Sequence, residues 1–226
     1  MVSGCDADVV VFQEATRPER LARIAAMAGM KQYASRSGES LAFMSRVPVA
    51  HHAWHKPWQS RHAFLEIVPE GDAFRIFGVH LSAVHAAWTE SRRVVEFRAL
   101  LSSIRRHQHG CHLLTGDFNT LAPGERLDIA ALPHRLRALI WLGGGRVRFR
   151  TIQRVLDAGY VDGFRLRHPD LPGLTFPTWG GQVRLDFAFV PAGFASRLKS
   201  CDVVTVPETR EASDHFPLLT EVDEGH

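Results

Sequence analysis

The stretch CHLLTGDFNT, residues 111–120, joins an apolar run to an abruptly polar end. The apolar part predicts a buried strand, and Asp117 and Asn119 stand where that strand should end. Side chains two residues apart in an extended chain point the same way, so both should face one point in space. A carboxylate and an amide at one point suit a phosphate, a water molecule or a metal ion. The same residue types also favour an ordinary turn, so this stretch alone leaves both interpretations open.

Polar side chains also stand at the ends of other predicted strands. We expect strands at residues 8–12, 40–45, 111–117, 183–191, 202–207 and 216–222, a hairpin at 62–82, and helices at 16–30 and 91–106. Thr16 and Glu19 predict a capping box at the start of the first helix. Acidic or imidazole side chains lie within or beside these strands, namely Glu14, His80, Asp186, Asp214 and His215. Such groups at several strand ends are how a rigid scaffold assembles a site.

Composition restricts the class of protein. The chain has 226 residues, 45% of them hydrophobic, and no linker divides it, which favours one domain over residues 1–226. The formal charge of +3 and the pI near 9.0 permit a phosphate-rich partner without requiring one. Three cysteines without a CxxC pair fit reduced thiols and a cytoplasmic location. We expect neither a membrane span nor a signal peptide, and the oligomeric state is left open.

Five segments together resemble a known family. They are, in chain order, DVVVFQE (8–14), GVHLS (78–82), GDFNT (116–120), RLDFAFV (184–190) and SDHFPL (213–218). Their order and approximate spacing are similar to those of the endonuclease/exonuclease/phosphatase superfamily, the DNase-I-like metal-dependent phosphoesterases. Residues 121–179 also resemble a bacterial subgroup. The resemblance implies an α/β fold, a four-layer α-β-β-α sandwich with two mixed sheets packed face to face and helices outside.

One departure from the family concerns its first strand. Members usually begin with a strand that carries an Asn, ahead of the strand that leads to the Gln-Glu pair. Here Gln13 and Glu14 follow the first strand of the chain, and the usual Asn-bearing strand is lacking. Two explanations are open: the natural start lies upstream, which we favour, or the strand has been lost. Removal of a strand leaves its neighbours with unpaired backbone groups, so lower stability or activity is expected.

The resemblance implies a divalent metal ion, Mg²⁺ in the first place and Mn²⁺ as an alternative. Glu14 would be its principal ligand, and Asp214 would bind metal or hold an imidazole. This agrees with the preference of Mg²⁺ for one or two carboxylates plus waters. Asp117 would orient and deprotonate the attacking water. Asn119 would hold a phosphate oxygen of the substrate or help to place that water.

The remaining roles that the resemblance implies concern the phosphoryl group. His215 would donate to its oxygens, and His80 would be a second phosphate contact or the acid for the leaving group. Asp186 would orient His80 or the metal-bound waters. Two further residues carry expectations of their own, apart from the resemblance. Arg184 would contact substrate phosphate, with a surface ion pair as an equal alternative. We expect Trp179 to pack in the core, with stacking on a base or sugar as the alternative.

Two other motifs carry less weight. The stretch HHAWH, residues 51–55, lacks the spacing and the fourth ligand of a zinc site. Arg146, Arg148 and Arg150 alternate in the stretch GGGRVRFR, residues 143–150. If that stretch is extended, the three would track a phosphate backbone, but a solvated face is the more common use of such a pattern.

Three functions fit the sequence. The first is a metal-dependent phosphodiesterase or nuclease that acts on DNA or RNA by in-line attack of an activated water. The second is a phosphatase or phosphodiesterase for a small-molecule or lipid phosphate, because a shared fold does not decide the substrate. The third is a truncated or degenerate binder without catalysis. The basic pI, the alternating Arg146, Arg148 and Arg150 and the possible stacking residues favour the first function. The retained polar residues at the strand ends argue against the third.

Overall fold

The computed structural model describes residues 4–71, 74–82, 87–107, 110–125, 137–138, 141 and 149–223. Its largest sheet has six strands in the order β4-β5-β6-β7-β9-β8. These are β4 (Val49–His55), β5 (Phe64–Pro69), β6 (Arg75–His80), β7 (His112–Asp117), β8 (Tyr160–Asp162) and β9 (Asp186–Pro191). The pair β6 and β7 is parallel and the other pairs are antiparallel, so the sheet is mixed.

A second layer of strands faces this sheet in two parts. The first part has three antiparallel strands in the order β1-β3-β2, namely β1 (Val9–Phe12), β2 (Gln32–Ser35) and β3 (Ala42–Ser45). The second part is the antiparallel pair β10 (Leu198–Val203) and β11 (Leu218–Val222). Phe43 of β3 packs with Leu65 and Ile67 of β5, and Leu198 of β10 packs with Val190 of β9. Both parts therefore bury one face against the six-stranded sheet.

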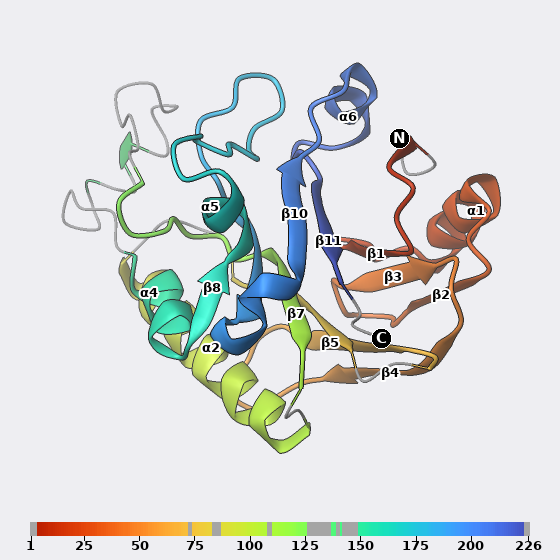
Figure 1. The fold of residues 1–226 in the computed structure, drawn as a ribbon, viewed down its shortest axis with the longest axis horizontal. Helices are drawn as coiled ribbons and strands as arrows, with labels where there is room; N and C mark the ends of the chain where they lie inside the picture. Colours follow the sequence, from red (N-terminus) through yellow and green to blue (C-terminus); the bar gives the residue numbers. More distant parts are fainter. Residues whose placement is uncertain are drawn as a thin grey trace.

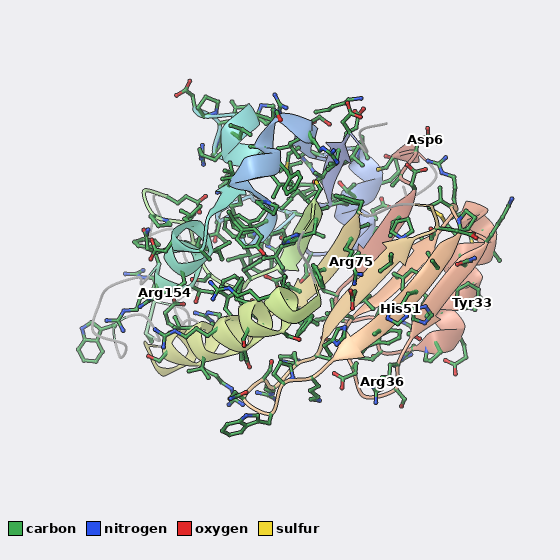
Figure 2. All side chains as sticks on the ribbon, turned by 60° about the horizontal axis from the view of Figure 1, so that its bottom comes forward. Asp6, Tyr33, Arg36, His51, Arg75 and Arg154 are labelled. Atoms are coloured by element: carbon green, nitrogen blue, oxygen red, sulfur yellow. The ribbon has the colours of Figure 1, made fainter. Side chains whose placement is uncertain are left out.

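Helices cover the two outer faces. Helix α1 (Pro18–Ala28) packs Ala25 against Met44 of β3. On the opposite side, α2 (Ala87–His107) and α4 (Arg150–Asp157) lie side by side against the six-stranded sheet, and Figure 2 shows α2 running along it. Phe97 and Ile152 of these helices share an apolar cluster with strand residues. The order helix, strand layer, strand layer, helix confirms the α-β-β-α sandwich.

The divided second layer leaves a groove between its parts. Among the described residues β1 pairs only with β3, and β11 pairs only with β10. Their free edges line one groove of about 1030 Å³, and β1 and β11 lie on its two sides (Figure 1). Val9 and Val11 pack toward the six-stranded sheet while Val10 and Phe12 pack toward α1. Both faces of β1 are thus covered, but one of its edges is open.

Local predictions fail at two places. Helix α1 has Arg17 as its N-cap and no side-chain capping bond, so the capping box of Thr16 and Glu19 does not form. Pro18 occupies the first helical position, where its fixed φ suits a helix start. The strand expected at 202–207 lies at Leu198–Val203. The residues before 202 that pair with β11 are partly polar, so the apolar pattern of the sequence does not mark them as a strand.

Short elements complete the chain. They are α5 (Gly163–Arg167), the 3₁₀ helix η3 (Ala192–Arg197) and α6 (Pro207–Ala212). None of the three cysteines, Cys5, Cys111 and Cys201, forms a disulfide bond. Of the helices described here, none has the length and apolar character needed to cross a bilayer.

Candidate active site

Three polar residues form a row across adjacent strands. In the parallel pair β6 and β7, His80 is the register partner of Asp117. In the antiparallel pair β7 and β9, Asp117 is in turn the partner of Asp186. Side chains of directly opposed residues lie on the same face of a sheet. The strand register therefore brings together three side chains that are distant in the sequence, and all three are largely buried.

Asp117 is held by a turn. Its Oδ1 accepts a hydrogen bond from the backbone N–H of Asn119 at 2.8 Å, which is the geometry of an Asx turn. The Asn119 side chain then donates from Nδ2 to Asp117 Oδ2 at 2.8 Å and to the carbonyl of Leu81 at 2.9 Å. Both hydrogens of the Asn119 side-chain amide are thereby used, and the Oδ1 atom of Asn119 remains to accept from another donor. The turn expected of this stretch is therefore present, and it orients the Asp117 carboxylate, which leaves the site interpretation open as well.

Two site residues have unusual backbone conformations. Glu14 has φ of 57° and Asn119 has φ of 51°, in the left-handed region that non-glycine residues rarely adopt. Asn tolerates this region better than Glu does. Backbone strain of this kind gathers at functional sites, where the surrounding structure imposes it. The chain therefore bends sharply directly after β1 and again after β7, and each bend carries one polar side chain.

His215 joins the row from the loop after α6. Its Nδ1 lies 2.7 Å from Asp186 Oδ2, and its ring packs on Phe176 with centroids 4.8 Å apart. Thr178 fixes this loop, because its N–H donates to the carbonyl of Asp214 and its hydroxyl donates to the carbonyl of Ser213. The Nδ1 contact leaves Nε2 as the atom that is available to a substrate.

The pKa values of Asp117 and His215 are both raised well above their ordinary values. Burial, assisted by the charge of Asp186, raises the pKa of Asp117 to about 8, although His215 acts against this. Burial lowers the pKa of His215, but the hydrogen bond and charge of Asp186 outweigh it and raise that pKa to about 9. His215 is therefore a cation at neutral pH, while Asp117 favours its protonated form in the protein alone.

The pKa of His80 is lowered, whereas the pKa of His215 is raised. Burial, with the charges of His62 and His215, lowers the pKa of His80 to about 4. Its Nε2 lies 3.8 Å from Asp117 Oδ2, beyond hydrogen-bond distance. Its Nδ1 is buried and has no hydrogen-bond partner among the described residues. A neutral imidazole is a poor acid, so the phosphate contact is the better of the two roles expected for His80.

The carboxylates fit a divalent cation. Glu14 is exposed and close enough to Asp117 to raise its pKa, and Asp214 is exposed as well. Glu14 also lines the groove together with Asp186 and His215. Within the described ranges no set of three or more His, Cys, Asp or Glu side chains forms a closed metal cluster. Mg²⁺ needs only one or two carboxylates plus waters, and the raised pKa of Asp117 beside Asp186 and Glu14 shows a concentration of negative charge that suits a cation.

Arg184 does not lie at the site surface. Its side chain is 1% exposed, and it donates to both carboxylate oxygens of Asp162 at 2.9 and 2.6 Å and to Glu125 at 2.6 Å. Its guanidinium also lies over the ring of Phe187. Neither the substrate contact nor the surface ion pair expected of Arg184 is supported by this placement. The side chain instead ties the start of β9 to β8.

Sequence reasoning overlooked His62 and misjudged Trp179. The ring of His62 stacks on His80 with centroids 5.3 Å apart and planes at 24°. A single histidine before an apolar strand carries no signal that would single it out. Trp179 was expected in the core but is 75% exposed, and it touches Phe176, which packs on His215.

The two discounted motifs are placed in part. His51 and His52 lie exposed on β4, and His55 bonds to Glu66 at 2.6 Å, so this strand holds no zinc site among the described residues. Figure 2 labels His51 on this sheet and Arg75, which also bonds to Glu66. Arg146 and Arg148 lie outside the described residues.

The sandwich and the row of imidazole and carboxylate groups define the class of phosphoester hydrolases. The chain belongs to the Endonuclease/Exonuclease/phosphatase family, whose model matches residues 1–215. No curated protein matches the chain in sequence.

Solved structures share the fold. A 3'-5' exonuclease (NExo) from Neisseria meningitidis is 21% identical, with a TM-score of 0.70 over 96% of this chain and 89% of that chain. A variant of the 3' phosphatase NExo from Neisseria, bound to a product DNA hairpin, has 21% identity and a TM-score of 0.69 over the same shares. An AP endonuclease from Archaeoglobus fulgidus is 16% identical, with a TM-score of 0.73 over 98% of this chain and 91% of that chain.

Proposed function

We propose that this protein is a divalent-metal-dependent phosphodiesterase or nuclease that hydrolyses phosphoester bonds in DNA or RNA. The observation that carries the proposal is the row of His80, Asp117 and Asp186 with His215 bound to its end. A buried carboxylate between a neutral and a cationic imidazole is suited to activate a water beside a phosphoryl group.

Each residue of the row has a distinct task. Asp117 accepts the proton of the attacking water. Asn119 holds the Asp117 carboxylate by two hydrogen bonds, and the Oδ1 atom of Asn119 accepts a hydrogen bond from that water. His215, kept protonated by Asp186, donates from Nε2 to a phosphoryl oxygen as negative charge develops. His80 remains neutral and supplies a second contact to the phosphoryl group.

Glu14 and Asp214 are the residues that would hold the metal ion. When bound, Mg²⁺ or Mn²⁺ supplies positive charge that neutralises the phosphate and lowers the pKa of nearby acids. With a cation held beside it, Asp117, whose pKa is raised to about 8 in the protein alone, would lose its proton at a lower pH and could act as a base at neutral pH. The proposal therefore makes activity dependent on the cation.

A nucleic-acid substrate is supported by three observations. Trp179 presents an exposed indole near His215, and an exposed aromatic ring offers a stacking surface to a base. The net charge of +3 and the pI near 9.0 are compatible with a polyanion. The structurally similar NExo variant is bound to a DNA hairpin, and the archaeal neighbour is an AP endonuclease.

The test compares two substrates under matched conditions. Hydrolysis of bis-p-nitrophenyl phosphate and of a DNA hairpin is measured with Mg²⁺, with EDTA, and in the variant Asp117→Asn. EDTA-sensitive cleavage of DNA that falls at least about 10²-fold in the variant supports the proposal. The exposed Asp170→Asn is the control and should retain full activity. Turnover of the small diester with no cleavage of DNA or RNA would instead indicate a small-molecule phosphodiesterase.

A further inference from the structure

The ring of His80 is not fixed by hydrogen bonds in the way that the ring of His215 is. His215 is oriented through Nδ1 by Asp186 at 2.7 Å. His80 has no partner for Nδ1 in the described part of the chain, and its Nε2 is 3.8 Å from Asp117. An imidazole at a reacting phosphate needs a defined orientation, because small misplacements are costly in rate. Something other than a hydrogen bond must set the plane of this ring.

The stacked ring of His62 meets that need. Its plane lies at 24° to that of His80 with 5.3 Å between the centroids, which is a stacked arrangement. His62 is half-buried in the segment between β4 and β5, so the ring that stacks on His80 comes from outside the strands that form the row. A ring in this position restricts rotation of His80 and limits the approach of water to it.

The segment that carries His62 is itself rigid. The N–H of Arg61 donates to Glu96 Oε1 at 3.1 Å, and the N–H of Ala63 donates to Glu39 Oε2 at 3.3 Å. The hydroxyl of Ser60 donates to the carbonyl of His62 at 2.6 Å. Three hydrogen bonds therefore hold the backbone on both sides of the histidine. A ring on such a segment can act as a fixed support.

Glu96 of α2 connects this support to the strand that carries His80. Its carboxylate is 1% exposed and accepts from the N–H of Ser82 at 3.2 Å and from the Ser82 hydroxyl at 2.9 Å. It also accepts from Arg61, next to His62. One buried carboxylate thus fixes both segments that bring the two rings together. Such an arrangement is preorganised around the ring pair.

We propose that His62 is a positioning residue that stacks on His80, fixes its ring plane and shields it from water, so that Nε2 meets the phosphoryl group in one orientation. This inference rests on the proposed function, because it assigns His80 to the phosphoryl group. His62 does not itself contact the reacting atoms.

Titration of His80 depends on all of its charged neighbours. They are His62 before β5, Asp186 on β9, His215 after α6 and Glu96 on α2, and Asp117 on β7 lies 3.8 Å from its Nε2. Burial and then the charge of His62 lower the pKa of His80. Removal of the His62 ring admits water and removes a like charge, and both changes raise that pKa. Phenylalanine at this position removes the charge but keeps the cover, so it should raise the pKa less.

The experiment uses the full chain and five variants. His62→Ala should lower kcat about tenfold with little change in KM, because orientation rather than binding is lost. His62→Phe, which keeps a stacked ring, should stay within about threefold of the parent rate. In the background of His80→Ala, the further change His62→Ala should have no effect, since a positioning residue acts only through its partner. His51→Ala, on an exposed face of β4, is the control.

A readout without turnover separates this inference from the proposed function. Long-range ¹H–¹⁵N NMR follows the titration of the His80 ring in the parent chain and in the two His62 variants. A rise in the His80 pKa of at least about one unit in His62→Ala, and a smaller rise in His62→Phe, supports the inference even if no substrate is cleaved. An unchanged titration, or additive losses in the double variant, overturns it.

Discussion

Asp186 and His215 form the best-defined contact of the site, with Oδ2 and Nδ1 separated by 2.7 Å. The contact outweighs the effect of burial and raises the pKa of His215 to about 9. A histidine whose pKa is raised on folding contributes stability that is complete below its ordinary pKa of 6.5 and is lost as the pH rises through 9. The protonated form, which we propose as the donor to a phosphoryl oxygen, disappears over the same alkaline range.

The first prediction concerns this pair. Asp186→Asn keeps a similar shape but removes the charge, so the pKa of His215 should fall. The alkaline limit of the pH–rate profile, measured at fixed saturating Mg²⁺, should then move down by at least about one pH unit. Asp202→Asn is the matched control, because Asp202 bonds to His168 at 2.8 Å outside the site. An alkaline limit at the same pH in both variants would remove Asp186 from this role.

The second prediction concerns the stability cost of Asp117. Its pKa is raised on folding from 3.8 to about 8, so ionisation of Asp117 destabilises the folded state increasingly as the pH rises between these values. Asp117→Asn should therefore be inactive yet more stable at pH 8, with a melting temperature at least about 2 °C above that of the parent. At pH 4 the difference should shrink. Melting curves at both pH values, without metal, check this, and equal or lower stability at pH 8 would contradict it.

The third prediction concerns the metal ion. Glu14→Gln removes one carboxylate from an exposed position that otherwise suits Mg²⁺. The Mg²⁺ concentration for half-maximal activity should rise at least about tenfold, while Glu19→Gln on α1 should leave it unchanged. Mg²⁺ should raise the melting temperature of the parent chain, and this rise should be lost in Glu14→Gln. Retention of both responses in Glu14→Gln would exclude Glu14 as the principal ligand.

The fourth prediction concerns the exposed indole of Trp179. Trp179→Ala should weaken binding of a DNA hairpin about tenfold, as loss of base stacking usually does, without altering hydrolysis of bis-p-nitrophenyl phosphate. Trp58 is 89% exposed and lies on another segment, so Trp58→Ala is the matched control. Equal DNA affinity in the two variants, measured by fluorescence anisotropy at one salt concentration, would show that stacking on Trp179 does not contribute.

Much of the fold was predictable because its strands are apolar and end in turns. The strands at residues 8–12 and 40–45 and the hairpin at 62–82 are present with small shifts. Strand β4 escaped prediction, because its pattern VAHHAWH mixes polar and apolar residues without strict alternation. Periodicity reports the faces of a strand and not its partners, so the open edges of β1 and β11 could not be read from it.

The site was predictable as a set of residues but not as an arrangement. The expectation that polar strand ends converge holds for His80, Asp117 and Asp186, since they are register partners in adjacent strands. Arg184 shows the limit of the approach. Its neighbour Asp186 faces the site, but the partners of Arg184, Asp162 and Glu125, come from distant segments that only the tertiary structure brings together.

The groove between β1 and β11 has a consequence for the behaviour of the protein at high concentration. Unpaired strand edges present rows of N–H and C=O groups that can recruit strands from other molecules. Here two such edges face each other and are lined by apolar side chains, among them Val10 and Leu219. Ordered intermolecular aggregation should therefore start at this groove, and charged substitutions along its edges should be the most effective way to keep the protein monodisperse.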